Sequence, residues 1–373
     1  MTCSVPAASP EEVAALLGPV ERLLGRAVPA SALRRVAGGG NNRLYRLDGS
    51  DGPLALKWYG ERTAGDAARL RREFGGLRFL AEAGVAGVPG AVAADPAAHA
   101  ALYDWIDGEP ASRDPAGRRP DDLAQALAFV GRLRDAATLP AAQTLPEATE
   151  ACLSAADLLG QIDERRDRLM TLEGEAELRA FIGTGLAPAL AAARARLWAL
   201  YDGAGLAPGR PVPPAARTLS PSDFGFHNAL RRPDGRLVFV DFEYFGWDDP
   251  VKLTADLLWH PGQSLSLDER RAWLSGTAAL FAPDPSYGVR LRAQVALFGL
   301  RWALIMLNEF LPDRWTRRLF AAPSAEAARA GWDAAKRTQL AKAEAWTAAA
   351  RRIADAGPEP ALFPVLPPPS LPF

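Results

Sequence analysis

Segments with the alternation typical of β-strands are concentrated near the start of the chain, and the remainder has mainly helical periodicity. Strands are predicted at 33–37, 43–47, 53–59 and 100–106. A helix is predicted at 66–83, because apolar residues recur there at helical spacing: Leu70, Phe74, Leu77 and Leu80. This order predicts a small antiparallel sheet with one helix, ahead of a larger and mainly helical part of the chain.

The second part of the chain is rich in alanine, leucine and arginine. The helices predicted there lie at 121–136, 147–171, 175–183, 186–201, 267–281, 289–311 and 324–356. One β-hairpin interrupts them, with strands 228–231 and 236–240 around a Pro-Asp-Gly turn. We therefore predict an α+β fold with two lobes, 1–106 and 107–373, of which 357–373 forms a proline-rich tail.

Charge and composition argue against several classes of function. A net charge of −1 on 373 residues gives no electrostatic footprint of a nucleic-acid or membrane-surface partner, so neither is predicted. The apolar stretch 295–311 contains Arg301, Asn308 and Glu309, and is predicted to be a buried helix and not a membrane span. Two cysteines and three histidines leave little for a disulfide framework or a histidine-based metal site. No signal peptide is visible at the N-terminus, so we predict a cytoplasmic location.

Lysine is rare in this chain, and one lysine occupies an unusual position. Only four of the 43 Lys and Arg residues are lysines, and Lys57 is the only one before Lys252. On the strand 53–59, Lys57 shares a face with the small Ala55, which would suit a flat base beneath Ala55 and phosphates near Lys57. A strand lysine more often faces solvent, but arginine would serve there equally well. A compact ammonium is harder to replace where phosphate and carboxylate share a tight site.

The helix predicted at 66–83 offers a carboxylate partner for that lysine. Glu73 lies on or beside the apolar stripe of this helix, at helical spacing from its leucines. A carboxylate on a buried stripe requires a cation, so we predict an ion pair between Lys57 and Glu73. The alternative is a partly exposed Glu73 that is neutralised by an arginine of its own helix, such as Arg69 or Arg72.

Three polar residues surround the predicted hairpin. Asp223 and Asn228 come at or before its first strand, and Asp241 directly follows its second strand. Asn228 and Asp241 supply the hard oxygen ligands that Mg²⁺ prefers, and Asp223 can orient a hydroxyl group and accept its proton. Any one of these residues alone would more often cap a turn. Their combination around one hairpin favours a magnesium-dependent phosphoryl-transfer site.

Together these elements resemble the aminoglycoside phosphotransferase and choline kinase-like family, which has a protein-kinase-like fold. The matching positions are Gly38-Gly39-Gly40-Asn41-Asn42, Ala55-x-Lys57, Glu73, Leu102–Ile106, Asp223-x₄-Asn228 and Asp241-Phe242-Glu243. The glycine segment is a weak signal by itself, because it keeps only Gly38-x-Gly40 of a G-x-G-x-x-G pattern. The resemblance predicts that the two lobes form a protein-kinase-like fold, with nucleotide binding in 1–106 and catalysis and substrate binding in 107–373.

This resemblance implies a kinase that uses ATP or GTP, with Mg²⁺, to phosphorylate a hydroxyl group of a sugar, amino sugar or amino alcohol. The nucleotide-binding residues that it implies are Gly38, Gly39, Gly40, Asn41, Asn42, Ala55, Lys57, Glu73 and a hinge of Asp104, Trp105 and Ile106. It implies that Asp223 is the catalytic base and that Lys57 holds the phosphates. It also implies that Asn228 and Asp241 bind the metal ion.

The chain departs from the family pattern around Asp223. Pro221-Ser222 stand where the family usually has His-Gly, which puts the geometry of the loop in question. His227 stands where the family usually has a small residue, and both a packing role and a substrate contact are open for it. The segment Asp249-Pro250-Val251-Lys252 breaks the Asp-Pro-x-x-Asp pattern of the family, and Asp256 could substitute one helical turn later.

Two other functions fit parts of the pattern. A non-catalytic nucleotide-binding or scaffold protein on the same fold would explain the loss of His-Gly. Such a protein has no chemical need for all five of Lys57, Glu73, Asp223, Asn228 and Asp241. A Mg²⁺-dependent hydrolase that uses Asp223 and Asp241 leaves Lys57 and the hinge-like strand unexplained. The acceptor, the preference for ATP or GTP and the oligomeric state are open at this point.

Overall fold

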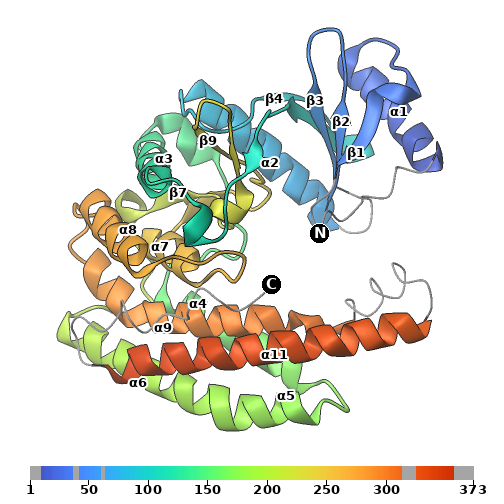
Figure 1. Cartoon of the computed structure of the whole chain (residues 1–373). Helices are drawn as coiled ribbons and strands as arrows, with labels where there is room; N and C mark the ends of the chain where they lie inside the picture. The colour runs from blue at the N-terminus through green and yellow to red at the C-terminus, as the bar shows by residue number, and fades with distance from the viewer. Residues whose placement is uncertain (1–9, 37–41, 60–63, 313–324, 357–373) are drawn as a thin grey trace. The chain divides into compact units, whose positions relative to one another are not determined.

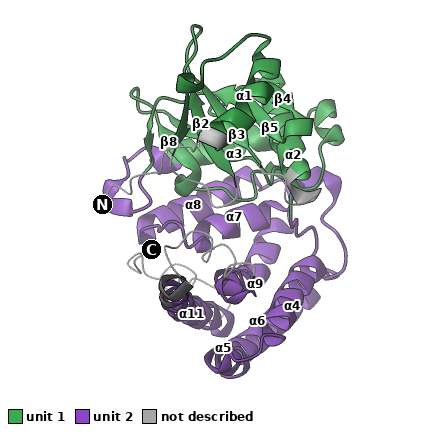
Figure 2. Ribbon diagram, turned by 90° about the vertical axis from the view of Figure 1, so that its right-hand side faces the viewer, with its two compact units in different colours: residues 1–111, 124–149, 219–247 green, residues 112–123, 150–218, 248–373 purple. Residues whose placement is uncertain are grey.

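The computed structural model of the chain describes residues 10–36, 42–59, 64–312 and 325–356 (Figure 1). The chain divides into two compact units that are interleaved in sequence (Figure 2). Unit 1 comprises 1–111, 124–149 and 219–247, and unit 2 comprises 112–123, 150–218 and 248–373. The assignment of nucleotide binding to 1–106 and of catalysis to 107–373 stays a prediction. The predicted tail 357–373 lies outside the described residues.

Unit 1 contains a five-stranded antiparallel sheet with the strand order β1-β2-β3-β5-β4. Its strands are β1 (Leu33–Val36), β2 (Arg43–Leu47), β3 (Leu54–Trp58), β4 (Ala91–Asp95) and β5 (Ala100–Asp104). Four of them confirm the predicted strands, although β5 ends two residues earlier than predicted. The sequence did not predict β4, because three of its five residues are alanine and the segment lacks the β-branched alternation of a strand.

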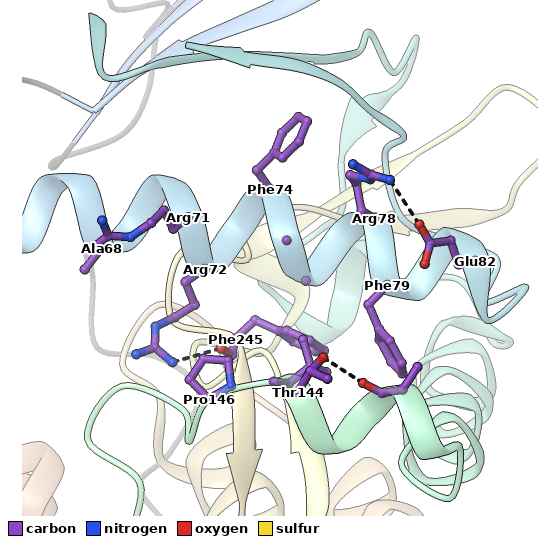
Figure 3. A pocket seen from close by; sticks show the side chains of 14 residues that line it. Ala68, Arg71, Arg72, Phe74, Arg78, Phe79, Glu82, Thr144, Pro146 and Phe245 are labelled. Carbon is purple, nitrogen blue, oxygen red and sulfur yellow. Dashed lines mark hydrogen bonds and ion pairs between the residues drawn. The ribbon is translucent and has the colours of Figure 1, made fainter. Parts of the chain in front are cut away.

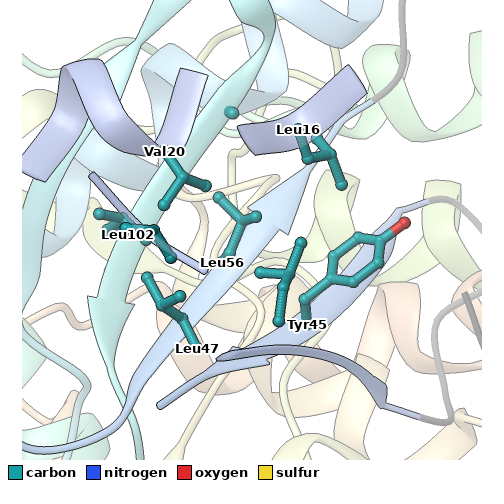
Figure 4. Close-up of a cluster of buried hydrophobic side chains, with 9 residues drawn as sticks. Leu16, Val20, Tyr45, Leu47, Leu56 and Leu102 are labelled. Atoms are coloured by element: carbon teal, nitrogen blue, oxygen red, sulfur yellow. The ribbon is translucent and has the colours of Figure 1, made fainter. Parts of the chain in front are cut away.

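One face of this sheet is covered by the helix α1 (Pro10–Leu24). Leu16 and Val20 from α1 pack against apolar side chains of the central strands (Figure 4). Those strand residues include Tyr45, Leu56 and Leu102, all of which are fully buried. Burial of each such side chain contributes about 1.5–3 kcal/mol. Because side chains alternate along β3, this apolar face leaves Lys57 on the opposite face of the sheet, as predicted.

The other elements of unit 1 position the loops that carry the predicted site. They are α2 (Ala64–Glu82), most of α3 (Asp122–Ala136), the three-stranded sheet β6-β8-β9 and the short strand pair β7-β10. Their strands are β6 (Glu109–Pro110), β7 (Thr218–Ser220), β8 (Ala229–Arg231), β9 (Leu237–Phe239) and β10 (Gly246–Asp248). The pairing of β8 with β9 confirms the predicted hairpin.

Unit 2 is built from helices: α4 (Ala155–Met170), α5 (Ala176–Phe181), α6 (Ala187–Gly203), α7 (Pro250–Trp259), α8 (Leu267–Leu280), α9 (Tyr287–Met306) and α11 (Ala325–Asp355). The prediction of a helix from 147 was wrong at its start, because Ser154 and Asp157 form a capping box that begins α4. The helix α7 was not predicted. All ten of its residues are buried, including Lys252 and Asp256, and the segment is only ten residues long, so it gave no long apolar stripe of the kind that predicts a helix.

The centre of unit 2 is α9, which packs against α4, α6, α7 and α11. A Cβ atom at Gly299 would lie 2.6 Å from the Trp259 ring, so glycine is required where α9 approaches α7. The Trp259 indole donates to the carbonyl oxygen of Val295 at 2.8 Å. Arg301 is also buried within this helix, as predicted for the stretch 295–311. Across the described residues, no helix has the length and apolarity needed to cross a membrane.

Two adjacent glycines of α2 should respond oppositely to alanine. A Cβ atom at Gly76 would lie 2.5 Å from Cδ1 of the buried Phe245 ring, whereas a Cβ atom at Gly75 would meet no atom within 4 Å. We expect Gly76→Ala to lower the free energy of unfolding by about 1–3 kcal/mol through overpacking. We expect Gly75→Ala to raise it by about 0.5–1 kcal/mol through helix propensity. Urea unfolding of the two variants measures both effects, and equal shifts would contradict the prediction.

Candidate active site

The ammonium group of Lys57 lies between two carboxylates. Its Nζ atom is 2.6 Å from Oε2 of Glu73 on α2 and 2.5 Å from Oδ1 of Asp241, which follows β9. The predicted Lys57–Glu73 pair is therefore confirmed. The two arginines of the alternative have other partners: Arg69 lies 3.7 Å from a carboxylate oxygen of Glu243, and Arg72 donates to backbone carbonyl groups.

Glu73 is held by more donors than Lys57 alone. The Tyr59 hydroxyl donates to Oε2 at 2.6 Å, and the backbone N–H of Phe242 donates to Oε1 at 3.2 Å. The hydroxyl groups of Tyr59 and Tyr103 lie 2.7 Å apart. Both carboxylate oxygens are thus occupied, which fixes the orientation of Glu73 toward the lysine. Neither tyrosine was predicted to be part of the site, although the alternation along β3 places Tyr59 on the face of Lys57.

Burial and charge act in opposite directions on this lysine. Burial by itself would lower the pKa of Lys57, but the carboxylates of Asp241 and Glu73 outweigh burial and raise its pKa above the ordinary value. Burial raises the pKa of Glu73, and Lys57 opposes this shift. The ammonium therefore remains positive throughout the physiological pH range. A permanent, enclosed positive charge is suited to bind phosphate oxygens.

Asp223 lies in the loop between β7 and β8, next to two polar side chains. Its Oδ1 atom is 3.0 Å from Nε2 of His227, and its Oδ2 atom accepts from Nδ2 of Asn228 at 3.2 Å. The same Nδ2 donates to the backbone carbonyl of Asp223 at 2.9 Å. The side chain of Asp223 is 31% exposed, whereas that of His227 is 8% exposed. The Asp223 carboxylate is therefore oriented by its neighbours and still accessible.

The residue before Asp223 has a backbone conformation that favours glycine. Ser222 has φ of 66°, and glycine adopts this region without the steric cost paid by other residues. Two hydrogen bonds hold Ser222 there: its N–H donates to Oγ of Ser220 at 3.0 Å, and its Oγ donates to the carbonyl of Thr149 at 3.2 Å. The replacement of His-Gly by Pro-Ser therefore keeps the left-handed turn before Asp223.

A sequence model described as "Phosphotransferase enzyme family" matches residues 32–285, which is more than half of the chain. The chain belongs to this phosphotransferase family. The match spans Lys57, Glu73, Asp223, Asn228 and Asp241. The predicted enzyme class, a phosphotransferase with a hydroxyl acceptor, and the predicted resemblance are confirmed by this membership. Among curated protein sequences, no significant match was found.

Solved structures of phosphotransferases are similar to this chain. A spectinomycin phosphotransferase, APH(9)-Ia, in complex with ADP and spectinomycin, has 10% identity and a TM-score of 0.53, over 94% of this chain and 98% of that one. The aminoglycoside phosphotransferase APH(4)-Ia has 16% identity and a TM-score of 0.51, over 88% and 95%. The streptomycin–ATP complex of APH(2")-IIa has 14% identity and a TM-score of 0.53, over 83% and 96%. These similarities confirm the predicted α+β, two-lobed protein-kinase-like fold.

The other predicted nucleotide-binding residues of the phosphotransferase lie on β3 and at the end of β5. Asp104 ends β5, and its backbone N–H donates to the carbonyl of Gly90 at 2.9 Å. Within the described residues, the backbone groups of Trp105 and Ile106 carry no hydrogen bond. Ala55 lies on β3 opposite Tyr103. These positions leave the hinge backbone accessible to a ligand.

The predicted glycine segment can be described only at its end. Gly38, Gly39, Gly40 and Asn41 lie outside the described residues. Asn42 donates through Nδ2 to Oε2 of Glu243 at 2.5 Å. This contact joins the start of β2 to the segment that follows Asp241.

The oxygen atoms near Asp241 fit a hard divalent cation. Carboxylate oxygens of Glu73, Asp241 and Glu243 lie within 4.8 Å of one another. Lys57 contacts Oδ1 of Asp241, and the side chain of Asp241 is 36% exposed. Asn228 uses its amide nitrogen in both of its hydrogen bonds to Asp223, which leaves the amide oxygen for another partner. This donor chemistry is the kind that Mg²⁺ prefers.

Proposed function

We propose that this protein is a small-molecule kinase that transfers the γ-phosphoryl group of ATP or GTP to a hydroxyl group of a sugar, amino sugar or amino alcohol. The family membership supports the coarser statement, a phosphotransferase that acts on a small molecule. The observation that carries the proposal is the enclosed ammonium of Lys57, which lies 2.6 Å from Glu73 and 2.5 Å from Asp241. The side chains of Lys57 and Asp241 are 11% and 36% exposed, so a phosphate group would reach the ammonium from the side of Asp241.

Asp223 is proposed to orient the acceptor hydroxyl group and to take its proton. Its carboxylate is 31% exposed, so a substrate hydroxyl can reach it. Hydrogen bonds from Asn228 and the contact with His227 fix its orientation. Proton acceptance by a positioned carboxylate contributes about 10²–10⁴-fold to the rate. In this proposal His227 positions Asp223 and does not contact the substrate.

Lys57 and its neighbours are proposed to hold the donor. Lys57 would contact the phosphate oxygens while Glu73 keeps the ammonium in place. The free backbone groups of Trp105 and Ile106 would hydrogen-bond to the base, over Ala55. Phosphoryl transfer depends mainly on such positioning and on charge neutralisation. The segment 38–42 is also proposed to bind the nucleotide.

Asn228 and Asp241 are the proposed metal ligands. The amide oxygen of Asn228 and the exposed part of the Asp241 carboxylate are oxygen donors. Mg²⁺, when bound, supplies positive charge that neutralises the phosphate oxygens. The backbone N–H of Val240 donates to the carbonyl of Asn228 at 2.9 Å, so the two ligand-bearing segments are tied together.

The aromatic and acidic segment after Asp241 contributes mainly to packing. The Phe245 ring lies against Gly76, and the indole of Trp247 donates to the carbonyl of Ala142 at 2.9 Å. Glu243 is 2% exposed and contacts Asn42. Glu243, Phe245 and Trp247 are therefore not proposed as residues that bind the phosphate acceptor. The identity of the acceptor must be determined by experiment.

A screen of acceptors tests the proposal. Purified protein is incubated with Mg²⁺ and either ATP or GTP, against panels of amino alcohols, sugars, amino sugars and nucleosides, and phosphorylated products are detected by mass spectrometry. We expect one acceptor class to be phosphorylated, together with slow nucleotide hydrolysis in its absence. Nucleotide binding with no transfer to any acceptor or to water would favour a non-catalytic scaffold and contradict the proposal.

Substitution of Lys57 by arginine tests why a lysine stands there. The guanidinium is larger and planar, and cannot take the place of the ammonium between Glu73 and Asp241. Loss of a charge-assisted contact of about 1.5–3 kcal/mol corresponds to a fall in turnover of about 10–100-fold. Lys336→Arg is the matched control, because Lys336 is also buried and contacts a carboxylate, Glu175. Equal turnover in both variants would show that Lys57 has no special role.

A further inference from the structure

A pocket of about 610 Å³ lies in unit 1 against one face of α2 (Figure 3). The α2 residues on this face recur at helical spacing: Ala68, Arg71, Arg72, Gly75, Phe79 and Glu82. The segment 141–146 and the Phe245 ring form the rest of the wall. The volume is typical of small-molecule sites. Its lining includes none of the residues proposed above for nucleotide, metal or proton transfer.

The pocket carries an excess of positive charge. Arg71, Arg72 and Arg78 line it, and Glu82 is the only acidic residue among the described residues that do so. Glu82 is engaged by Arg78 at 3.3 Å. Arg71 and Arg72 have no carboxylate partner within the described part of the chain. An anionic group would therefore find two arginines that no carboxylate of the described residues neutralises.

Arg72 makes two hydrogen bonds to the backbone and has other N–H groups that bond to no described residue. Its Nη1 atom donates to the carbonyl oxygens of Glu147 and Phe245, and the second of these distances is 3.2 Å (Figure 3). Both contacts use the same nitrogen, so Nε and Nη2 are not bonded to any described residue. Burial lowers the pKa of Arg72, which reflects the cost of enclosing a charge without a counter-ion. A bound anion would remove that cost.

Apolar surface lies beside these arginines. Figure 3 shows that Phe79 and Arg72 extend from α2 toward Thr144 and Pro146. Gly75 is at the centre of the helix face, and a Cβ atom there would meet no atom within 4 Å. We propose that this pocket binds a small ligand that joins an anionic group to an apolar body, and that its occupancy regulates the active site through α2.

The coupling runs through two neighbouring residues of α2. Arg72 donates to the carbonyl of Phe245, and Glu73 accepts from the N–H of Phe242, so both ends of the segment 242–245 are attached to the helix. Asp241 directly precedes this segment and contacts Lys57. An anion that fixes Arg72 stabilises this arrangement and therefore raises the affinity for nucleotide. This coupling rests on the proposed function.

Binding of 1-naphthalenesulfonate, an anion on an aromatic body, tests the site. Isothermal titration calorimetry is carried out on the full chain saturated with Mg²⁺ and a non-hydrolysable ATP analogue, so that the probe does not bind at the nucleotide site. We expect the charge-reversal variant Arg71→Glu and the filling variant Gly75→Phe each to weaken binding at least about tenfold, about 1.4 kcal/mol. Unchanged binding in either variant would overturn the assignment of the pocket.

Two variants elsewhere serve as controls. Arg271→Glu makes the same charge change on the exposed face of α8, where the Arg271 side chain is 60% exposed. Gly160→Phe introduces the same ring at an open glycine of α4, where a Cβ atom would also meet nothing within 4 Å. Both should bind the probe as the parent protein does. Equal weakening in the controls would show that binding is non-specific and overturn the site.

The regulatory part is tested by measuring nucleotide affinity with and without the probe. Because coupling is reciprocal, the probe should tighten nucleotide binding by the same factor by which nucleotide tightens probe binding. Identical nucleotide affinities would overturn regulation. If the chain binds no nucleotide even without the probe, the proposed function fails and the coupling fails with it. Titration of the probe alone would still decide whether the pocket binds an anion.

Discussion

The variant Asp223→Asn is expected to lose turnover by about 10²–10⁴-fold while binding Mg²⁺-nucleotide as the parent protein does. Asparagine preserves the shape of the side chain but cannot accept the proton of the acceptor hydroxyl group. Asp223 contacts His227 and Asn228, and makes no contact with the Lys57 ammonium in the described structure, so nucleotide affinity should be unaffected. Initial rates and calorimetric titration with a non-hydrolysable nucleotide separate the two effects.

The control for this variant is Asp234→Asn, which makes the same chemical change in the turn between β8 and β9. Asp234 is 42% exposed and contacts Arg236 of its own turn. Its substitution should leave turnover within the error of the assay. Near-normal turnover of Asp223→Asn, or equal losses in both variants, would remove Asp223 from the catalytic role.

The pairing of Lys57 with Glu73 could be predicted because both residues follow local periodicities. Alternation along β3 placed the lysine opposite the apolar face that packs on α1, and the helical stripe placed the glutamate on the buried side of α2. A buried carboxylate requires a cation, so this ion pair can be predicted without knowledge of the fold. Asp223 and Asn228 could also be predicted to lie close together, because they are only five residues apart in the sequence.

The remaining contacts of that site depend on long-range register. Asp241 reaches Lys57 across 184 residues, and Phe242 reaches Glu73 across 169 residues. The hydroxyl group of Tyr103 contacts Tyr59 only because β5 pairs with β3 in the register observed here. Such pairings are set by the packing of the whole unit. No local periodicity indicates them.

The sequence predicts only that Lys252 breaks an Asp-Pro-x-x-Asp pattern, for which Asp256 could substitute. The structure gives Lys252 a role of its own. In unit 2 its Nζ atom lies 3.0 Å from Oδ2 of Asp248 and 3.0 Å from Oδ2 of Asp256. Asp256 lies four residues later on α7, which is the spacing of helical ion pairs, whereas Asp248 ends β10 before the helix begins. Asp249 instead caps α7 and pairs with Arg290 at 2.9 Å.

The variant Lys252→Met is expected to lower the free energy of unfolding by about 3–5 kcal/mol. Lys252 is 1% exposed, and Asp248 and Asp256 are at most 3% exposed, so removal of the ammonium leaves two enclosed carboxylates without their shared counter-ion. The backbone N–H of Cys152 and the Trp302 indole still donate to these carboxylates, and the Arg301 guanidinium remains 3.8 Å from Asp256, but Asp248 has no other ion pair among the described residues. Urea unfolding at neutral pH measures the loss.

The pH dependence of that loss distinguishes electrostatics from packing. Burial alone would lower the pKa of Lys252, but Asp248 and Asp256 outweigh it and raise the pKa above about 10.4. In the parent protein the lysine therefore stays charged in both states below that pH, and its contribution is constant. In Lys252→Met the native state binds more protons than the unfolded state, because burial raises the pKa of the remaining Asp248 carboxyl. Stability of the variant then increases as pH falls from neutral toward the ordinary aspartate pKa of about 3.9, and the deficit shrinks over that range.

The control for this variant is Lys342→Met on α11. Lys342 is also buried, at 6% exposure, but burial lowers its pKa, whereas the carboxylates beside Lys252 raise the pKa of that lysine. Methionine preserves the length and apolar volume of the side chain, so this variant should lose much less stability than Lys252→Met. A deficit in Lys252→Met that matches the control, or one that is independent of pH, would mean that the lysine contributes only its hydrocarbon chain. A large loss of unfolding free energy that becomes smaller at low pH would show that the charge of Lys252 stabilises α7.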